Sequence, residues 1–112
     1  MYSRLLSPPT LHLFFVISTG TLPPSLGQLS HVRTVFLHMN NFRGTIPSSI
    51  GQCHELRNLQ LWSNRLEGPV PTSLAKLQHI ELLVLCGNSG LKGAEPIAQA
   101  LRERRGAKFR FN

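Results

Sequence analysis

The sequence predicts an α/β solenoid, in which short parallel strands and return turns repeat along the chain. Glycines recur every 24 residues, at Gly20, Gly44 and Gly68, and each stands three positions before a proline. The segments 29–51 and 53–75 align position by position, and 77–93 continues in the same register. Because a unit with one apolar stripe cannot bury that stripe alone, such units stack on their neighbours.

Each unit begins with a predicted short strand. Apolar residues at alternate positions are typical of a strand with one buried face. The alternating pairs are Val35 and Leu37, Leu59 and Leu61, and Leu83 and Leu85. Two further apolar columns, Leu29, Cys53, Leu77 and Val32, Leu56, Ile80, are expected to complete the core.

An asparagine follows each strand, at Asn40, Asn64 and Asn88. The chain turns inward there and exposes backbone groups that no strand can satisfy. An amide side chain is both a donor and an acceptor, so we expect these asparagines to form a ladder bonded to the backbone of the turns. Their predicted role is structural.

The return path of each unit carries turn residues. Gly44 and Gly68 are expected to adopt a backbone geometry closed to other residues, and Pro47 and Pro71 to fix an extended segment. The hydroxyl residues that follow, Ser48, Ser49, Thr72 and Ser73, suit the start of a short convex turn.

The combined pattern, LxxLxxLxLxxNxLxGxIPxxLG, resembles the plant-type leucine-rich repeat over about two thirds of the chain, residues 21–93. The resemblance implies a right-handed superhelix with a short parallel sheet on the concave face and loops or 3₁₀ turns on the convex face. It also implies a recognition surface without catalytic chemistry.

Residues 94–112 are predicted to form a C-terminal α-helix and a basic tail. Glu95 and Pro96 suit a first turn and Gly106 can end the helix. Its apolar face would contain Ala94, Ile97, Ala98 and Leu101. The segment from Asn88 onward is similar to the helix-bearing repeats of the ribonuclease-inhibitor type, which implies that residues 109–111 begin another strand.

Residues 1–20 allow two interpretations. Leu5, Leu11, Leu13 and Gly20 continue the repeat register, as in a degenerate repeat. Arg4, the apolar run 13–17 and the small residues Ser18 and Gly20 are typical of a secretory signal. No stretch of the sequence is long enough to span a membrane.

Charge and cysteine content give weaker indications. The formal net charge is +7, and five cations lie within nine residues: Arg102, Arg104, Arg105, Lys108 and Arg110. They either form a solvated surface or contact phosphate or an acidic partner. Cys53 falls in a core column and Cys86 on the concave surface, so we expect two free thiols. These thiols and the absence of an N-x-Ser/Thr sequon favour an intracellular location, whereas a signal at residues 1–20 would place the chain at the cell surface or outside.

The predicted binding surface consists of side chains between and just after the strand leucines, which point away from the core. The candidate protein-binding residues are Phe36, His38, Met39, Gln60, Trp62 and Val84. Aromatic residues and methionine are typical interface anchors, so we expect a protein or peptide ligand. In the alternatives, this face packs against another segment or a second copy, the exposed ends of the solenoid pair, the chain is an inactive fragment of a larger receptor-like protein, or the basic tail contacts nucleic acid.

Catalytic and metal sites have little support in the sequence. His31, Glu55 and His79 share one repeat position and could in principle bind zinc, but a surface ladder is the prediction. Beside them, Arg57 is expected to pair weakly with Glu81. There is no glycine-rich phosphate loop, nucleophile elbow or paired-carboxylate arrangement. The sequence therefore predicts a protein that is not an enzyme and needs no cofactor or metal.

Overall fold

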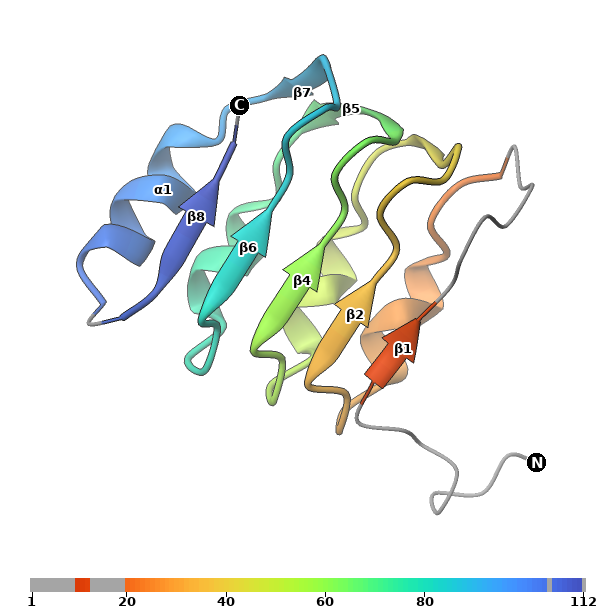
Figure 1. Cartoon of the computed structure of the whole chain (residues 1–112). Coiled ribbons are helices and arrows are strands. Elements are labelled where there is room, and N and C mark those ends of the chain that lie inside the picture. Colours follow the sequence, from red (N-terminus) through yellow and green to blue (C-terminus); the bar gives the residue numbers. More distant parts are fainter. Residues whose placement is uncertain (1–9, 13–19, 105, 112) are drawn as a thin grey trace.

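The computed structural model describes residues 10–12, 20–104 and 106–111, which form a short solenoid of stacked coils. Five parallel strands lie side by side, with the helical turns behind them (Figure 1). In spatial order they are β1 (Thr10–His12), β2 (Thr34–Phe36), β4 (Asn58–Gln60), β6 (Leu82–Val84) and β8 (Lys108–Arg110). The predicted α/β solenoid is confirmed.

The middle residue of each central strand points into the core, and Val35, Leu59 and Leu83 are at most 1% exposed. The register between β2, β4 and β6 is 24 residues, because Thr34 pairs with Asn58 and Asn58 with Leu82. The alternating pattern suggested strands that include Leu37, Leu61 and Leu85. The strands end one residue before these leucines, which are nevertheless buried.

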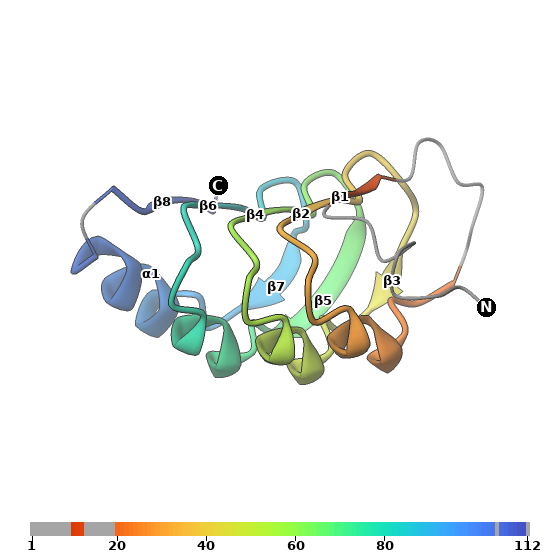
Figure 2. The same cartoon turned by 90° about the horizontal axis from the view of Figure 1, so that it is seen from below.

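A layer of helical turns covers the inner face of the sheet. It contains the 3₁₀ helices η2 (Pro24–Gln28), η3 (Ser48–Gln52) and η4 (Thr72–Lys76), together with α1 (Glu95–Arg102) (Figure 2). The prolines before η3 and η4 are extended, with φ −66° and ψ 135° at Pro47 and φ −66° and ψ 132° at Pro71. Each 3₁₀ helix buries one large apolar side chain, namely Leu26, Ile50 and Leu74.

A second, three-stranded parallel sheet joins the coils along one side of the solenoid. It contains β3 (Arg43–Gly44), β5 (Arg65–Pro69) and β7 (Gly90–Lys92), where the sequence had suggested only loops. Gly44 and Gly68 within it have φ of +74° and +80°, a left-handed conformation that favours glycine. The third coil has one more residue between its asparagine and the next buried leucine, so the register changes from 22 to 23 residues.

The C-terminal unit replaces the 3₁₀ helix by α1, which buries Ile97, Ala98 and Leu101. The helix ends at Arg102, four residues before Gly106, so the sequence-based prediction of its end was wrong. The chain leaves the helix where the Arg104 guanidinium donates hydrogen bonds to the carbonyl oxygens of Leu77 and Ala75 at the end of η4. β8 then pairs with β6 at an offset of 26 residues.

At the other end of the sheet, β1 pairs with β2 and Thr10 lies opposite Thr34, which continues the 24-residue offset. Residues 1–9 and 13–19, on which the signal-like interpretation depends, lie outside the described part of the chain. Among the residues that the structure describes, no helix combines the length and apolar character needed to cross a bilayer.

Candidate functional site

The candidate site is the surface of the five-stranded sheet turned away from the 3₁₀ helices and α1, which we term the open face (Figure 2). Side chains alternate along a strand, so the neighbours of the buried middle residues point to this face. Its strand positions form two rows across β2, β4, β6 and β8: Thr34, Asn58, Leu82, Lys108 and Phe36, Gln60, Val84, Arg110. His38, Trp62 and Cys86 follow just after the strands.

Three rings meet on the open face, and we term Phe36, His38 and Trp62 the aromatic cluster. The rings of His38 and Trp62 are stacked, with centroids 4.5 Å apart and planes at 8°. The Phe36 ring meets His38 edge to face, at 5.7 Å and 68°. All three side chains are half-buried. The 24-residue repeat brings His38 and Trp62 together because it places them at equivalent positions of adjacent coils.

A chain of side-chain hydrogen bonds fixes the orientation of Trp62. The Trp62 indole N–H donates to Gln60 Oε1 at 3.0 Å. Gln60 Nε2 in turn donates to Asn58 Oδ1 at 3.2 Å. Since side chains held in this way lose less freedom on binding, the arrangement is preorganised for contact. Asn58 belongs to the site through this contact, which the repeat pattern alone does not show.

The two remaining candidates, Met39 and Val84, differ in accessibility. Met39 is 49% exposed and lies in the turn beyond β2, with φ of 59°. The equivalent residues Ser63 and Gly87 also have positive φ, so this turn is left-handed in every central coil. Val84 is only 8% exposed although it lies outside the main core cluster, so it supports the open face more than it extends it.

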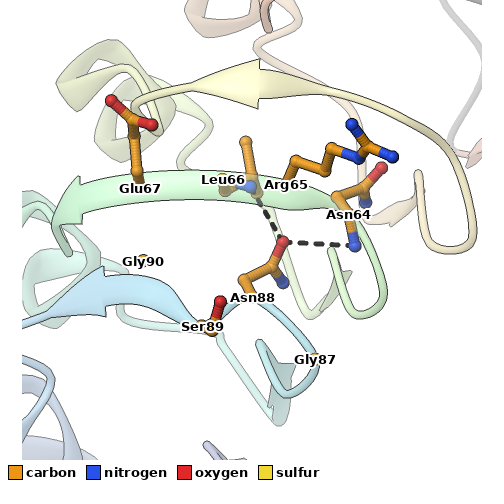
Figure 3. Close-up of a pocket in the computed structure, with 8 residues that line it drawn as sticks. All are labelled: Asn64, Arg65, Leu66, Glu67, Gly87, Asn88, Ser89 and Gly90. Carbon is orange, nitrogen blue, oxygen red and sulfur yellow. Dashed lines mark hydrogen bonds between the residues drawn. The ribbon is translucent and has the colours of Figure 1, made fainter.

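The asparagines lie beyond the strands and join successive coils. Asn64 Nδ2 donates to the carbonyl oxygens of Leu37 at 2.9 Å and Leu61 at 3.1 Å, and its Oδ1 accepts from the Phe42 N–H at 3.2 Å. Asn88 Oδ1 accepts from the N–H groups of Asn64 and Leu66 in the same manner (Figure 3). The Asn40 amide donates to the Leu37 carbonyl at 3.1 Å. All three asparagines are buried.

A pocket of about 410 Å³ lies between β5 and β7, beside this ladder (Figure 3). Its lining residues are Asn64, Arg65, Leu66, Glu67, Gly87, Asn88, Ser89 and Gly90. Asn88 Oδ1, which faces this region, already accepts two backbone hydrogen bonds. None of the predicted protein-binding residues lines this pocket, so it is separate from the open face.

Ionisable side chains gather on the rim where the strands begin. The His31 Nδ1 and Glu55 Oε2 atoms are 2.9 Å apart, and Arg33 Nε lies 3.7 Å from Glu55 Oε1. The hydrogen bond with His31, aided by Arg33, holds the pKa of the Glu55 carboxyl below its usual value. The expected Arg57–Glu81 pair is not formed among the described residues; the pairing acid is Glu55 instead. In the described ranges, no three His, Cys, Asp or Glu side chains converge as metal ligands would.

The two cysteines are free and lie on opposite sides of the sheet. Cys53 is fully buried, and its thiol lies 3.2 Å from the carbonyl oxygen of Leu26. Burial raises the pKa of the Cys53 thiol, so the thiol stays protonated at neutral pH. Cys86 is half-buried on the open face.

The basic residues near the C-terminus do not form one patch. Arg102 pairs with Glu95 at 3.1 Å on the exposed side of α1. Arg104 is half-buried and bonded to carbonyl groups of η4. Lys108 and Arg110 instead lie on the open face. Arg105 falls outside the described residues.

Comparison with known proteins gives a consistent result. The family model described as Leucine Rich Repeat matches residues 31–53 and 55–77. Among solved structures, PEPR1–AtPEP1 is 29% identical with a TM-score of 0.71, over 80% of this chain and 12% of that one. The BIR3–SERK2 complex from Arabidopsis thaliana is 30% identical with a TM-score of 0.68, over 83% of this chain and 49% of that one.

A leucine-rich-repeat protein from Leptospira interrogans is 26% identical with a TM-score of 0.68, over 82% of this chain and 22% of that one. The chain therefore spans less than half the length of each of these proteins. No curated protein sequence shows a significant match to it. The repeated sequence, the stacked coils and these similarities together identify the chain as a leucine-rich-repeat protein.

Proposed function

We propose that the chain recognises a protein or peptide, without catalysis, through the open face of its sheet. The aromatic cluster carries this proposal. Three half-buried rings lie together on a sheet face that no other described element covers. Rings of this kind provide large contact areas at low cost in conformational entropy, and tryptophan is among the commonest hot-spot residues of interfaces.

The proposed contact residues are those predicted from the sequence: Phe36, His38, Met39, Gln60, Trp62 and Val84. Trp62 is the proposed anchor, because it is stacked on one side and hydrogen-bonded through its N–H. Met39, the exposed residue beyond β2, would extend the contact past the aromatic cluster. Gln60 offers an amide close to the rings, where an extended peptide backbone could pair with it.

The similar structures support an assembly role for this fold. One of them is of the BIR3–SERK2 complex, and the chain covers 49% of the protein that it matches there. Because that coverage is partial, the partner is inferred here from this chain's own open face. Nucleic-acid binding by the basic tail has less support, since the structure divides those cations among three surfaces.

A peptide-display selection on the purified chain, followed by calorimetry, tests the proposal. Replacing an interface anchor costs about 2 kcal/mol or more, so Trp62→Ala should weaken selected peptides at least about tenfold. Lys76→Ala, an exposed change in η4 behind the sheet, should leave affinity unaltered. Circular dichroism would establish that both variants are folded. Equal affinity of Trp62→Ala and the unmodified chain would rule out the open face as the binding surface.

A further inference from the structure

Resting on the proposed function, we infer that the ligand of the open face is a peptide segment with an acidic group three or four residues from an apolar anchor. The acidic group would lie over β8, where Lys108 and Arg110 project. The anchor would lie over the aromatic cluster. The ligand would therefore run across the strands, from β2 or β4 towards β8.

The composition of the open face changes steadily across the sheet. Aromatic side chains lie over β2 and β4, the aliphatic Leu82 and Val84 over β6, and two cations over β8. The register places Lys108 beside Leu82 and Arg110 beside Val84, so both cations belong to the same two rows as the apolar side chains. None of the described strand residues in these rows is acidic.

The two cations are available to a ligand. Lys108 and Arg110 are exposed, whereas Phe109 between them turns inward and packs against the core. Neither cation forms an ion pair within the described residues, in contrast to Arg102, which pairs with Glu95. An arginine and a lysine one strand position apart can together hold a carboxylate, and the arginine can do so with two parallel hydrogen bonds.

The strand spacing sets the distance between anchor and acid. Adjacent strands are about 4.8 Å apart, so β8 lies about 10 Å from the Trp62 coil and about 14 Å from the Phe36 coil. An extended peptide advances about 3.3 Å per residue, so three or four residues cover this distance. A shorter spacing would leave the acid over Leu82 and Val84, where an unpaired charge is unfavourable.

Defined peptides can test the inference. The probes are acetyl-Phe-Leu-(Ser)n-Glu-Glu-amide with n from 0 to 6, whose blocked ends carry no charge. Their neutral counterparts carry Gln-Gln in place of Glu-Glu. The chain has one tryptophan, Trp62, so its fluorescence reports binding at the open face directly. An exposed ion pair contributes about 0.2–1 kcal/mol, so two pairs predict about a fivefold preference for the acidic probe. The preference should be largest near n = 2 or 3 and should shrink in high salt.

Two double variants locate the effect. Replacing Lys108 and Arg110 by alanine should abolish the preference for Glu-Glu over Gln-Gln. Replacing Arg43 and Lys92 by alanine removes the same charge from the second sheet and should leave the preference intact. Equal binding of acidic and neutral probes, or equal loss in both double variants, would overturn the inference. The proposed function would survive that result if the neutral probe still binds with a change in Trp62 fluorescence. If no probe binds, both proposals are wrong.

Discussion

The two central coils and the C-terminal unit cover the same sheet with different structures. In the central coils, η3 and η4 return the chain, the strands repeat every 24 residues and an asparagine joins each coil to the preceding one. In the C-terminal unit, α1 returns the chain and the strand offset grows to 26 residues. Contacts of Arg104 with the end of η4 attach this unit to its neighbour.

The difference shows how stability is distributed along the solenoid. A central strand has neighbours on both sides, and its middle residue Leu59 is fully buried. Phe109 has the equivalent place in β8 but is only half-buried, because β8 is the last strand of the described sheet. Since each coil contacts only its neighbours, the central coils should be the most stable part and the C-terminal unit should open more readily.

The largest predicted effect tests the central coils. In Asn64→Ala, the carbonyls of Leu37 and Leu61 and the N–H of Phe42 lose their side-chain partner. An unsatisfied buried group costs about 1–3 kcal/mol, so the free energy of unfolding should fall by about 3 kcal/mol or more. Urea titration followed by circular dichroism measures the loss. Asn41→Ala, an exposed change in the same turn, is the control. A loss below about 1 kcal/mol would mean that the ladder contributes little.

The second prediction tests whether the C-terminal unit opens independently. Leu101→Ala removes a side chain that is 1% exposed, and such a truncation costs about 2–4 kcal/mol. Hydrogen exchange in this variant should accelerate in α1 and β8 while β2 and β4 stay protected. The matched truncation Leu59→Ala should accelerate exchange in every coil. Uniform acceleration in both variants would show that the solenoid unfolds as one unit.

The repeat made the architecture and the core predictable from the sequence. Equivalent positions of successive units must lie in one column of a stacked fold, so burial at Val35 implies burial at Leu59 and Leu83. The same reasoning placed His38 and Trp62 on one surface. It also indicated the C-terminal helix, because Ala94, Ile97 and Leu101 recur at helical spacing.

Contacts between individual side chains were less predictable. The column of Arg33, Arg57 and Glu81 suggested an Arg57–Glu81 pair, but Glu55 lies within reach of Arg33 and pairs with it. Arg104 appeared to be one cation of a solvated cluster, yet it bonds carbonyl groups 27 and 29 residues earlier in the chain. A repeat pattern fixes which positions are neighbours. Rotamers and local competition decide which of those neighbours interact.

The smallest predicted effect concerns pH and the rim of the sheet. The pKa of Glu55 is lower in the folded chain than in the unfolded chain, chiefly because Glu55 accepts a hydrogen bond from His31. The ionised carboxylate therefore stabilises the fold above its unfolded pKa, and this contribution disappears as the pH falls through the folded pKa. The pair is exposed, so the contribution is small and screened by salt.

Glu55→Gln should therefore lower the urea midpoint slightly at neutral pH, and the two proteins should become equally stable in acid. Glu67→Gln removes an exposed carboxylate on the second sheet and should show no such convergence, because no ion pair involves Glu67 within the described residues. A gap between Glu55→Gln and the unmodified chain that persists in acid would indicate that Glu55 acts through packing. In that case, the His31–Glu55 contact between adjacent coils would not be electrostatic in origin.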